Sequence, residues 1–234
     1  MLTNYAAKSR YRTGVGIPAV FRGACGAGLH AGPFHSINAE SLFLNTPGLK
    51  IVEPSTAYDA KGLIKAAIRD DDPVLFFEHK KLYRLPRLRE ELPEDDYIVE
   101  IGKARTAREG SDLSIITFGA QVLNALDAAD ELNKHGISAE VIDLRTLAPM
   151  DTEAIITSVK KTNRVLILHE ASRTGGIGGE IAAQVAEYAF EFLDAPIVRV
   201  AAIDSPVPYA PPLEQYHLPQ ITDVVDAARK LAEY

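Results

Sequence analysis

The sequence predicts an α/β protein with mostly parallel sheets, on three observations. Short apolar runs alternate with longer amphipathic segments, which is the pattern of parallel strands joined by helices that cover the sheet. Residues 74–77 are apolar at every position, as expected of a strand covered on both faces. The chain has 234 residues, of which 47% are hydrophobic, enough for a large core in one or two domains.

Composition and charge exclude several classes of protein. Charged residues make up 24% of the chain, which is ordinary globular usage and excludes a disordered chain or a coiled-coil rod. The net charge of -7 argues against broad nucleic-acid binding. A single cysteine, Cys25, excludes a disulfide framework and fits a reducing compartment. No apolar run reaches the roughly 18 to 20 residues of a membrane span, and no signal peptide opens the chain.

Each expected element follows from its apolar pattern. An amphipathic helix opens the chain, and strands and helices then alternate to the end. We expect strands over 17–22, 49–53, 74–77, 113–118, 139–143, 164–169 and 197–202, and helices over 2–12, 39–44, 57–69, 121–134, 152–162, 179–192 and 221–233. The glycine-rich stretch 23–32 is expected to lie outside regular structure, and the proline-rich segment 205–212 is expected to be a rigid spacer.

These elements divide into two units. Residues 1–84 form a first αβ unit, 85–109 a linker, and 110–234 a second and more complete αβ domain. The stretch 79–96 is charged and interrupted by prolines, so it is either a solvated connector or part of an interface. Three parallel strands make a poor independent sheet. The first unit is therefore expected to borrow strands from a partner or to lack some of its own.

The glycine-rich loop after the first strand carries two histidines, His30 and His35. A loop in this position lies at the carboxyl end of a parallel sheet, where α/β folds bind ligands. A histidine there can hydrogen-bond an oxyanion or move a proton near neutral pH. From spacing alone, His35 is either catalytic or a residue that orders the loop, and Ser36 is either part of the site or the cap of the next helix.

Other candidates are weaker. Cys25 is either a nucleophile or a buried small residue, and His30 with His35 lacks the third ligand that a zinc site usually has. Asp70 and Asp72 follow a helix end, so they form either an oxygen-rich cation site or an acidic turn. The glycines of 174–180 precede a helix, where they permit either close packing or a phosphate nest.

Blocks of residues along the whole chain recur in one known family. In order, they are Gly26-Ala-Gly28, His35-Ser36, Glu40, Thr46 to Lys50, Pro54-Ser55, Asp59 to Leu63, Ala67 to Pro73, Phe77 to Arg84, Ile142 to Pro149, Glu170, Gly175-Gly176 and Pro206. They resemble the β subunit of the E1 component of 2-oxo acid dehydrogenase complexes, of the branched-chain 2-oxo acid or pyruvate type. The resemblance implies a transketolase-like fold, with a partial thiamine pyrimidine-binding domain in 1–84 and a transketolase-like C-terminal domain in 110–234.

The resemblance also implies roles for particular residues. His35 matches the histidine that faces the reacting carbon of the cofactor, so it is the expected catalytic and cofactor-binding residue. This sequence has Ile37 where the family usually has glutamine. Asp70 and Asp72, with the carbonyl of Ala67, match positions that hold a potassium ion in some relatives. The glycine-rich stretch 175–180 matches a loop that serves assembly.

Partners, cofactor and substrate follow from the same resemblance. The cofactor is thiamine diphosphate, shared with an α subunit that holds the diphosphate and its Mg²⁺ in an α2β2 heterotetramer. The substrate is a branched-chain 2-oxo acid, such as 3-methyl-2-oxobutanoate, or pyruvate, and the acyl group passes to the lipoyl group of the E2 acyltransferase. No nucleic-acid or membrane partner is expected. The expected location is the cytoplasm, or the mitochondrial matrix in a eukaryote.

One departure from the family concerns the start of the chain. The family's N-terminal segment, which supplies the first strands and the glutamate that hydrogen-bonds the aminopyrimidine, has no counterpart among these residues. Glu40 and Glu78 stand at the wrong place in the motif order to replace that glutamate. The expectation is therefore an incomplete β subunit that is inactive without the α subunit and the missing N-terminal segment. The alternative is a non-catalytic module for assembly or E2 docking.

Overall fold

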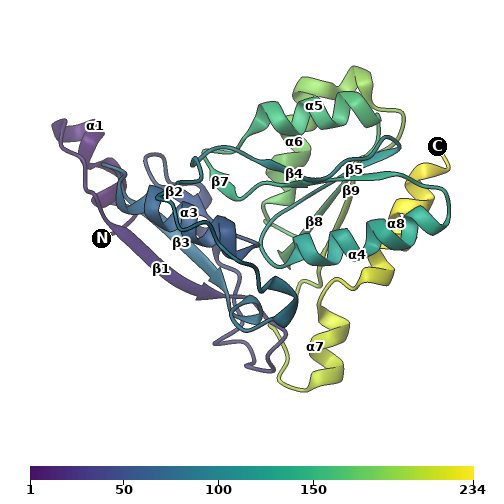
Figure 1. The fold of residues 1–234 in the computed structure, drawn as a ribbon, viewed down its shortest axis with the longest axis horizontal. Helices are drawn as coiled ribbons and strands as arrows, with labels where there is room; N and C mark the ends of the chain where they lie inside the picture. Colours follow the sequence, from purple (N-terminus) through teal and green to yellow (C-terminus); the bar gives the residue numbers. More distant parts are fainter.

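The computed structural model describes residues 1–234 and folds them into two sheets flanked by helices (Figure 1). The strands are β1 (Val20–Cys25), β2 (Lys50–Val52), β3 (Val74–His79), β4 (Arg105–Arg108), β5 (Leu113–Thr117), β6 (Ala139–Asp143), β7 (Thr146–Ala148), β8 (Val165–Ser172) and β9 (Val198–Ala202). The α-helices are α1 (Ser9–Thr13), α2 (Glu40–Leu44), α3 (Ala57–Ile68), α4 (Gln121–Lys134), α5 (Thr152–Thr162), α6 (Gly178–Ala189), α7 (Pro211–His217) and α8 (Ile221–Ala232). Single 3-10 turns occur at Ala6–Lys8, Lys80–Leu82, Pro86–Leu88 and Phe190–Phe192.

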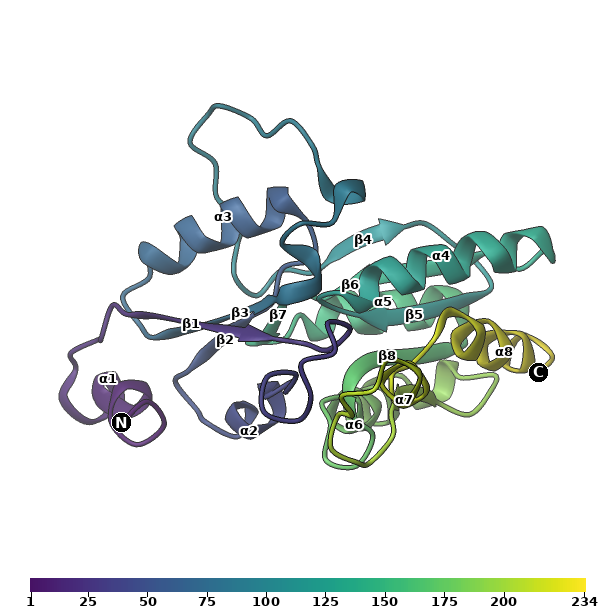
Figure 2. The same cartoon turned by 90° about the horizontal axis from the view of Figure 1, so that it is seen from below.

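The first sheet has the strand order β1-β3-β2-β7. Strands β1, β3 and β2 run parallel, and β7 joins β2 antiparallel from the later part of the chain. Figure 2 shows α3 on one side of this sheet and α2 on the other. Successive side chains of β3 point to opposite faces of the sheet, which explains this arrangement. Phe76 packs in the apolar cluster with Leu63 of α3, and Phe77 packs in the larger cluster on the other face.

The second sheet has the order β4-β6-β5-β8-β9, parallel except for the edge strand β4. Helices α5 and α6 cover one face, and α4 and α8 cover the other (Figure 1). Helix α4 buries Val122, Ala125, Ala129 and Leu132, the spacing of one helical face. The predicted α/β fold with mostly parallel sheets is confirmed. None of the helices combines the length and the apolar character that a membrane span requires.

The structure corrects several expected elements. Gly23 belongs to β1, in the stretch expected to be irregular, because it pairs with Phe77 of the parallel strand β3. The expected helix 2–12 is instead a 3-10 turn followed by the five-residue α1. Strand β4 lies inside the predicted linker, and β7 comes from the region assigned to the second domain although it pairs in the first sheet.

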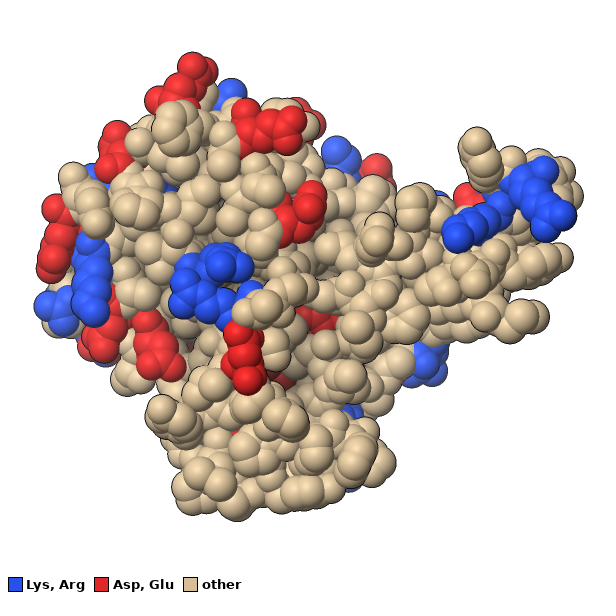
Figure 3. All heavy atoms as spheres, turned by 180° about the vertical axis from the view of Figure 1, so that it is seen from behind, with Lys and Arg blue, Asp and Glu red and all other residues tan.

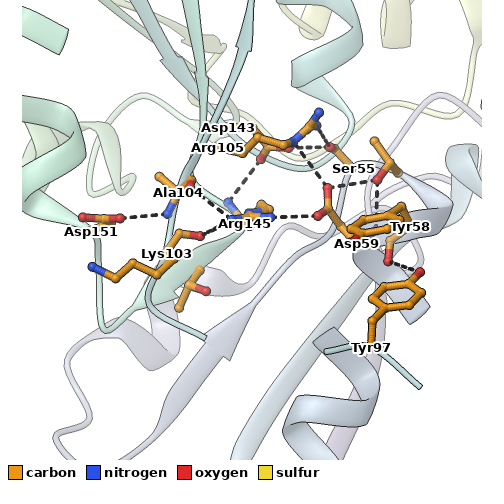
Figure 4. A network of polar contacts seen from close by, with 12 residues as sticks. Ser55, Tyr58, Asp59, Tyr97, Lys103, Ala104, Arg105, Asp143, Arg145 and Asp151 are labelled. Atoms are coloured by element: carbon orange, nitrogen blue, oxygen red, sulfur yellow. Dashed lines mark hydrogen bonds and ion pairs between the residues drawn. The ribbon is translucent and has the colours of Figure 1, made fainter. Parts of the chain in front are cut away.

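A polar network joins the two units across their boundary (Figure 4). Asp59 of α3, 1% exposed, pairs with Arg145 Nη1 at 3.0 Å, and Arg105 Nε lies 3.6 Å from it. Asp143, fully buried at the end of β6, accepts hydrogen bonds from Ser55 Oγ at 2.5 Å and Arg105 Nη2 at 3.0 Å. Because each buried carboxylate has partners from both units, the network fixes the orientation of the two sheets.

Candidate active site

The loop after β1 (residues 26–39, here called the His35 loop) lies where the carboxyl ends of the two sheets meet. From the end of β8, Glu170 accepts a hydrogen bond from the backbone of Ala27 at 2.8 Å. Beyond β2, Glu53 lies so close to Gly119, just after β5, that a Cβ at Gly119 would come 2.1 Å from its carboxylate oxygen. Strands β5 and β8 flank the point where the strand order of the second sheet reverses, which is the usual ligand crevice of such sheets. Here the first unit fills that crevice.

The predicted catalytic residue, His35, is exposed on this loop. Its backbone N–H contacts the carbonyl of Gly32 at 3.4 Å, and its imidazole has no hydrogen-bond partner within the chain. The neighbouring Phe34 is 81% exposed. The imidazole is therefore free to bind a ligand outside the chain, and the catalytic role of His35 stays a prediction.

Glu170 is the centre of the hydrogen bonds beneath the His35 loop. Besides Ala27, it accepts hydrogen bonds from Asn38 Nδ2 at 3.1 Å and Gln121 Nε2 at 3.0 Å, and His79 Nε2 lies 3.0 Å away. Burial alone would raise the pKa of Glu170, but His79 and the donated hydrogen bonds outweigh burial and hold that pKa at about 2. Glu170 is therefore a permanent anion that ties both ends of the loop to the second unit.

Two further carboxyl groups are buried close to Glu170. Burial raises the pKa of Glu40, 2% exposed at the start of α2, to about 7, and the charge of Glu170 adds to that effect. Burial likewise raises the pKa of Glu53 well above its ordinary value. Cys25, His79 and Asp143 are the other titratable groups that act on this pair. Glu40 therefore retains its proton over much of the neutral range.

Replacing Glu40 by glutamine is expected to flatten the dependence of stability on pH. Because the folded pKa of Glu40 is raised from 4.5 to about 7, its contribution is full below pH 4.5 and is lost as the pH rises through 7. The loss amounts to about 3 kcal/mol for a shift of this size. Urea unfolding between pH 4.5 and 8 measures it. An identical pH slope in the Glu40→Gln variant would contradict the assignment, since removing the charge of Glu40 also lowers the pKa of Glu53 and flattens the slope further.

The other interpretations of the loop residues can now be compared with their positions. Ser36 does not cap the next helix: the N-cap of α2 is Ala39, without a side-chain bond, and the buried Ser36 hydroxyl has no partner in the chain. Burial raises the pKa of the Cys25 thiol, which disfavours the thiolate that a nucleophile needs. His30 Nδ1 lies 2.7 Å from Glu214, and no group of three His, Cys, Asp or Glu side chains could hold a metal ion.

Close packing explains the two glycines around the start of α6, Gly176 and Gly178. A Cβ at Gly176 or Gly178 would come within 2.5 Å or 2.7 Å of the ring of His169, which is fully buried beneath them. Larger residues would therefore displace the loop from β8. This contact favours close packing over a phosphate nest.

The predicted potassium ligands lie together at the end of α3, but each is already bonded. Asp70 Oδ2 lies 2.5 Å from Lys50 Nζ, and Asp72 Oδ1 lies 2.6 Å from Arg10 Nε. The carbonyl of Ala67 accepts from the backbone of Asp70 at 3.4 Å. Lys50 and Arg10 thus neutralise the carboxylates that a cation would use, and the potassium site stays a prediction.

Thermal unfolding in two salts tests that prediction. A potassium site requires that replacing sodium by potassium at constant ionic strength raises Tm, and that Asp70→Asn removes the difference. Equal melting in both salts would contradict the site and leave Lys50 and Arg10 as the partners of the two carboxylates.

Comparison with known proteins identifies the family. The family description "Transketolase, pyrimidine binding domain" matches residues 1–86, and "Transketolase, C-terminal domain" matches residues 102–224. The 2-oxoisovalerate dehydrogenase subunit beta of Bacillus subtilis (strain 168) is 51% identical over 232 residues, which cover 98% of this chain and 70% of that protein. This chain belongs to the E1 β subunits of 2-oxo acid dehydrogenases. The pyruvate dehydrogenase E1 component subunit beta of the same organism is 48% identical over 230 residues, with 97% and 70% coverage.

Solved structures confirm the transketolase-like fold of this E1 β chain. A split-gene transketolase, described as an inactive β4 tetramer, aligns with a TM-score of 0.73 and 26% identity over 91% of this chain and 66% of that one. A mutant transketolase from Pichia stipitis aligns with a TM-score of 0.63 and 16% identity over 93% of this chain and 30% of that one. The resemblance expected from the sequence is therefore confirmed at the level of family and fold.

Proposed function

We propose that this chain is the β subunit of a thiamine-diphosphate-dependent E1 enzyme that oxidatively decarboxylates 3-methyl-2-oxobutanoate or pyruvate and transfers the acyl group to lipoyl-E2. The observation that carries the proposal is the exposed, unbonded imidazole of His35, on a loop tied at Ala27 and Asn38 to the buried Glu170. The two relatives reported above bear the names of a 2-oxoisovalerate and a pyruvate dehydrogenase, which supports these two substrate classes.

His35 acts as the proton-transferring and hydrogen-bonding group of this chain. The imidazole can donate a hydrogen bond to a developing oxyanion or accept a proton. Thiamine diphosphate supplies, when bound, the nucleophilic carbon and electron sink that decarboxylation needs. The free, exposed imidazole of His35 fits the approach of such a group. The diphosphate and its Mg²⁺ belong to the α subunit.

The surface around His35 supports an α subunit as the partner. Figure 3 shows a lower lobe almost free of charged side chains, and this end of the molecule carries the His35 loop and α7 in Figure 1. We call its exposed apolar side chains the loop patch: Leu29, Phe34, Ile37, Tyr209, Leu213 and Tyr216. A large exposed apolar patch marks an interaction site. The solved relative described as an inactive β4 tetramer fits a chain that needs its partner for activity.

Reconstitution with an E1 α subunit, and with the family's N-terminal segment supplied, tests the proposal. The mixture is expected to form a complex with this chain and to reduce a dye acceptor when a 2-oxo acid and thiamine diphosphate are added, whereas this chain alone is inactive. A panel of pyruvate, 3-methyl-2-oxobutanoate and 2-oxoglutarate distinguishes the substrates. Complex formation without turnover of any 2-oxo acid would contradict the catalytic proposal.

A further inference from the structure

The segment between β9 and α8 contacts the His35 loop through one buried carboxylate. Glu214 of α7 is 1% exposed. Its Oε1 accepts hydrogen bonds from the backbone N–H of Gly28 at 3.0 Å and of His30 at 3.2 Å, and its Oε2 lies 2.7 Å from His30 Nδ1. A carboxylate that receives two backbone N–H groups and an imidazole makes charge-assisted hydrogen bonds, which are roughly twice as strong as neutral ones.

The same segment makes a second contact with the His35 loop, at Gly32. A Cβ at Gly32 would come 2.1 Å from the ring of Tyr209, and Gly32 has φ +67°, in the left-handed region. The Tyr209 ring therefore lies directly on the loop backbone, three residues before His35. The segment expected to be a spacer, 205–212, together with α7, is a support for the loop.

We propose that Glu214 is a positioning residue for the reaction: it fixes the first half of the His35 loop from the C-terminal domain, while Glu170 fixes its two ends. This inference rests on the proposed function of His35. Residues 28 and 30 bond to Glu214, residue 32 packs on Tyr209, and residues 27 and 38 bond to Glu170. His35 lies between Gly32 and Asn38, so its backbone is fixed on both sides, although its side chain has no bond in the chain. A shift of about 1 Å in such a group can reduce turnover about 100-fold.

The experiment uses the complex with the α subunit and a double-mutant cycle. Glu214→Ala is expected to lower kcat about 100-fold and to leave KM for the 2-oxo acid nearly unchanged. In a His35→Ala background, Glu214→Ala is expected to have little further effect, because its role depends on His35. Gly32→Ala, which overlaps the Tyr209 ring, is expected to reproduce the loss by a second route. Equal, additive losses in both backgrounds, or an unchanged kcat, would overturn the proposal.

Exchange of individual amides gives a readout that does not require turnover. In Glu214→Ala, the amides of Gly28 and His30 are expected to exchange faster with solvent, while amides of β5 and β8 keep their protection. The matched control is Glu131→Ala, which removes an exposed carboxylate that pairs with Lys134 and lies 3.8 Å from His135. If the wild-type complex shows no turnover, the proposed function fails and exchange alone decides: unchanged protection of the two amides overturns the positioning role.

Discussion

Replacing His35 by alanine is expected to lower kcat of the assembled enzyme by about 100- to 10,000-fold, the range for loss of a positioned acid–base group. The fold should be unaffected, because the imidazole is exposed and bonds to nothing within the chain. The α subunit should therefore still bind, and the melting temperature should stay the same. Reduction of a dye acceptor by the reconstituted complex measures the effect.

Alanine variants of two other histidines, His135 and His30, serve as controls for His35→Ala. His135 is exposed at the end of α4, far along the chain from the loop, so His135→Ala should keep full activity. His30→Ala removes the side-chain partner of Glu214 but leaves the backbone bonds of the loop, so its loss should be smaller than that of His35→Ala. Undiminished turnover in His35→Ala would contradict a catalytic role for this residue, and a larger effect of His30→Ala would assign that role to His30.

The elements that the sequence predicts well are those with long periodic patterns. Helix α4 and strand β6 have the expected bounds, because each presents enough apolar residues at one period to be distinguished from a loop. Strand β7 has only three residues and α7 begins with two prolines, so neither carries a periodic signal. Gly23 looked like a loop residue because propensity favours that interpretation, whereas parallel pairing with β3 makes it part of a strand.

Prediction of the candidate site from the sequence is limited in the same way, because its residues lie far apart in the chain. The family motif around His35 predicts this residue as part of the site, and Glu170 is among the matching blocks. Glu214 is a single acidic residue in a proline-rich segment, and it meets Gly28 across 186 positions of the chain. No spacing rule links two such residues. A buried carboxylate opposite backbone N–H groups becomes visible only once the fold brings α7 to the loop.

The two units share one apolar core, and this explains why several carboxyl groups are buried at the site. Cys25 and Phe77 of the first sheet lie in the same apolar cluster as Ile142 and Ile167 of the second. The carboxyl ends of both sheets are therefore held face to face, and polar residues at these ends must be buried together. Glu53 and Glu170 are buried together because both lie at the carboxyl ends of strands, and Glu40 at the start of α2 is buried beside them.

Glu170→Gln is expected to reduce the free energy of unfolding by about 3 kcal/mol at pH 7, the cost of removing one partner from a buried charged pair. The glutamine carries donors where Ala27, Asn38 and Gln121 already point donors at the carboxylate. It therefore leaves some of these donors unpaired in the interior. Urea unfolding measures the change, and Glu180→Gln, an exposed residue that contacts only Gln184, should stay within about 0.5 kcal/mol of the parent.

The stability difference between the parent and Glu170→Gln is expected to depend on pH. Because the pKa of Glu170 is lowered from 4.5 to about 2, its contribution is full above pH 4.5 and is lost as the pH falls through 2. The stability difference between the parent and Glu170→Gln should therefore shrink by about 3 kcal/mol between pH 5 and pH 2. Carboxylates that lie far from Glu170 cancel in this difference. The pKa of Glu40 falls when the charge of Glu170 is removed, so the comparison is made below pH 5, where Glu40 keeps its proton. A difference that stays the same in acid would show that Glu170 is not held as an anion by His79 and the loop, and that the contact between the two units has another origin.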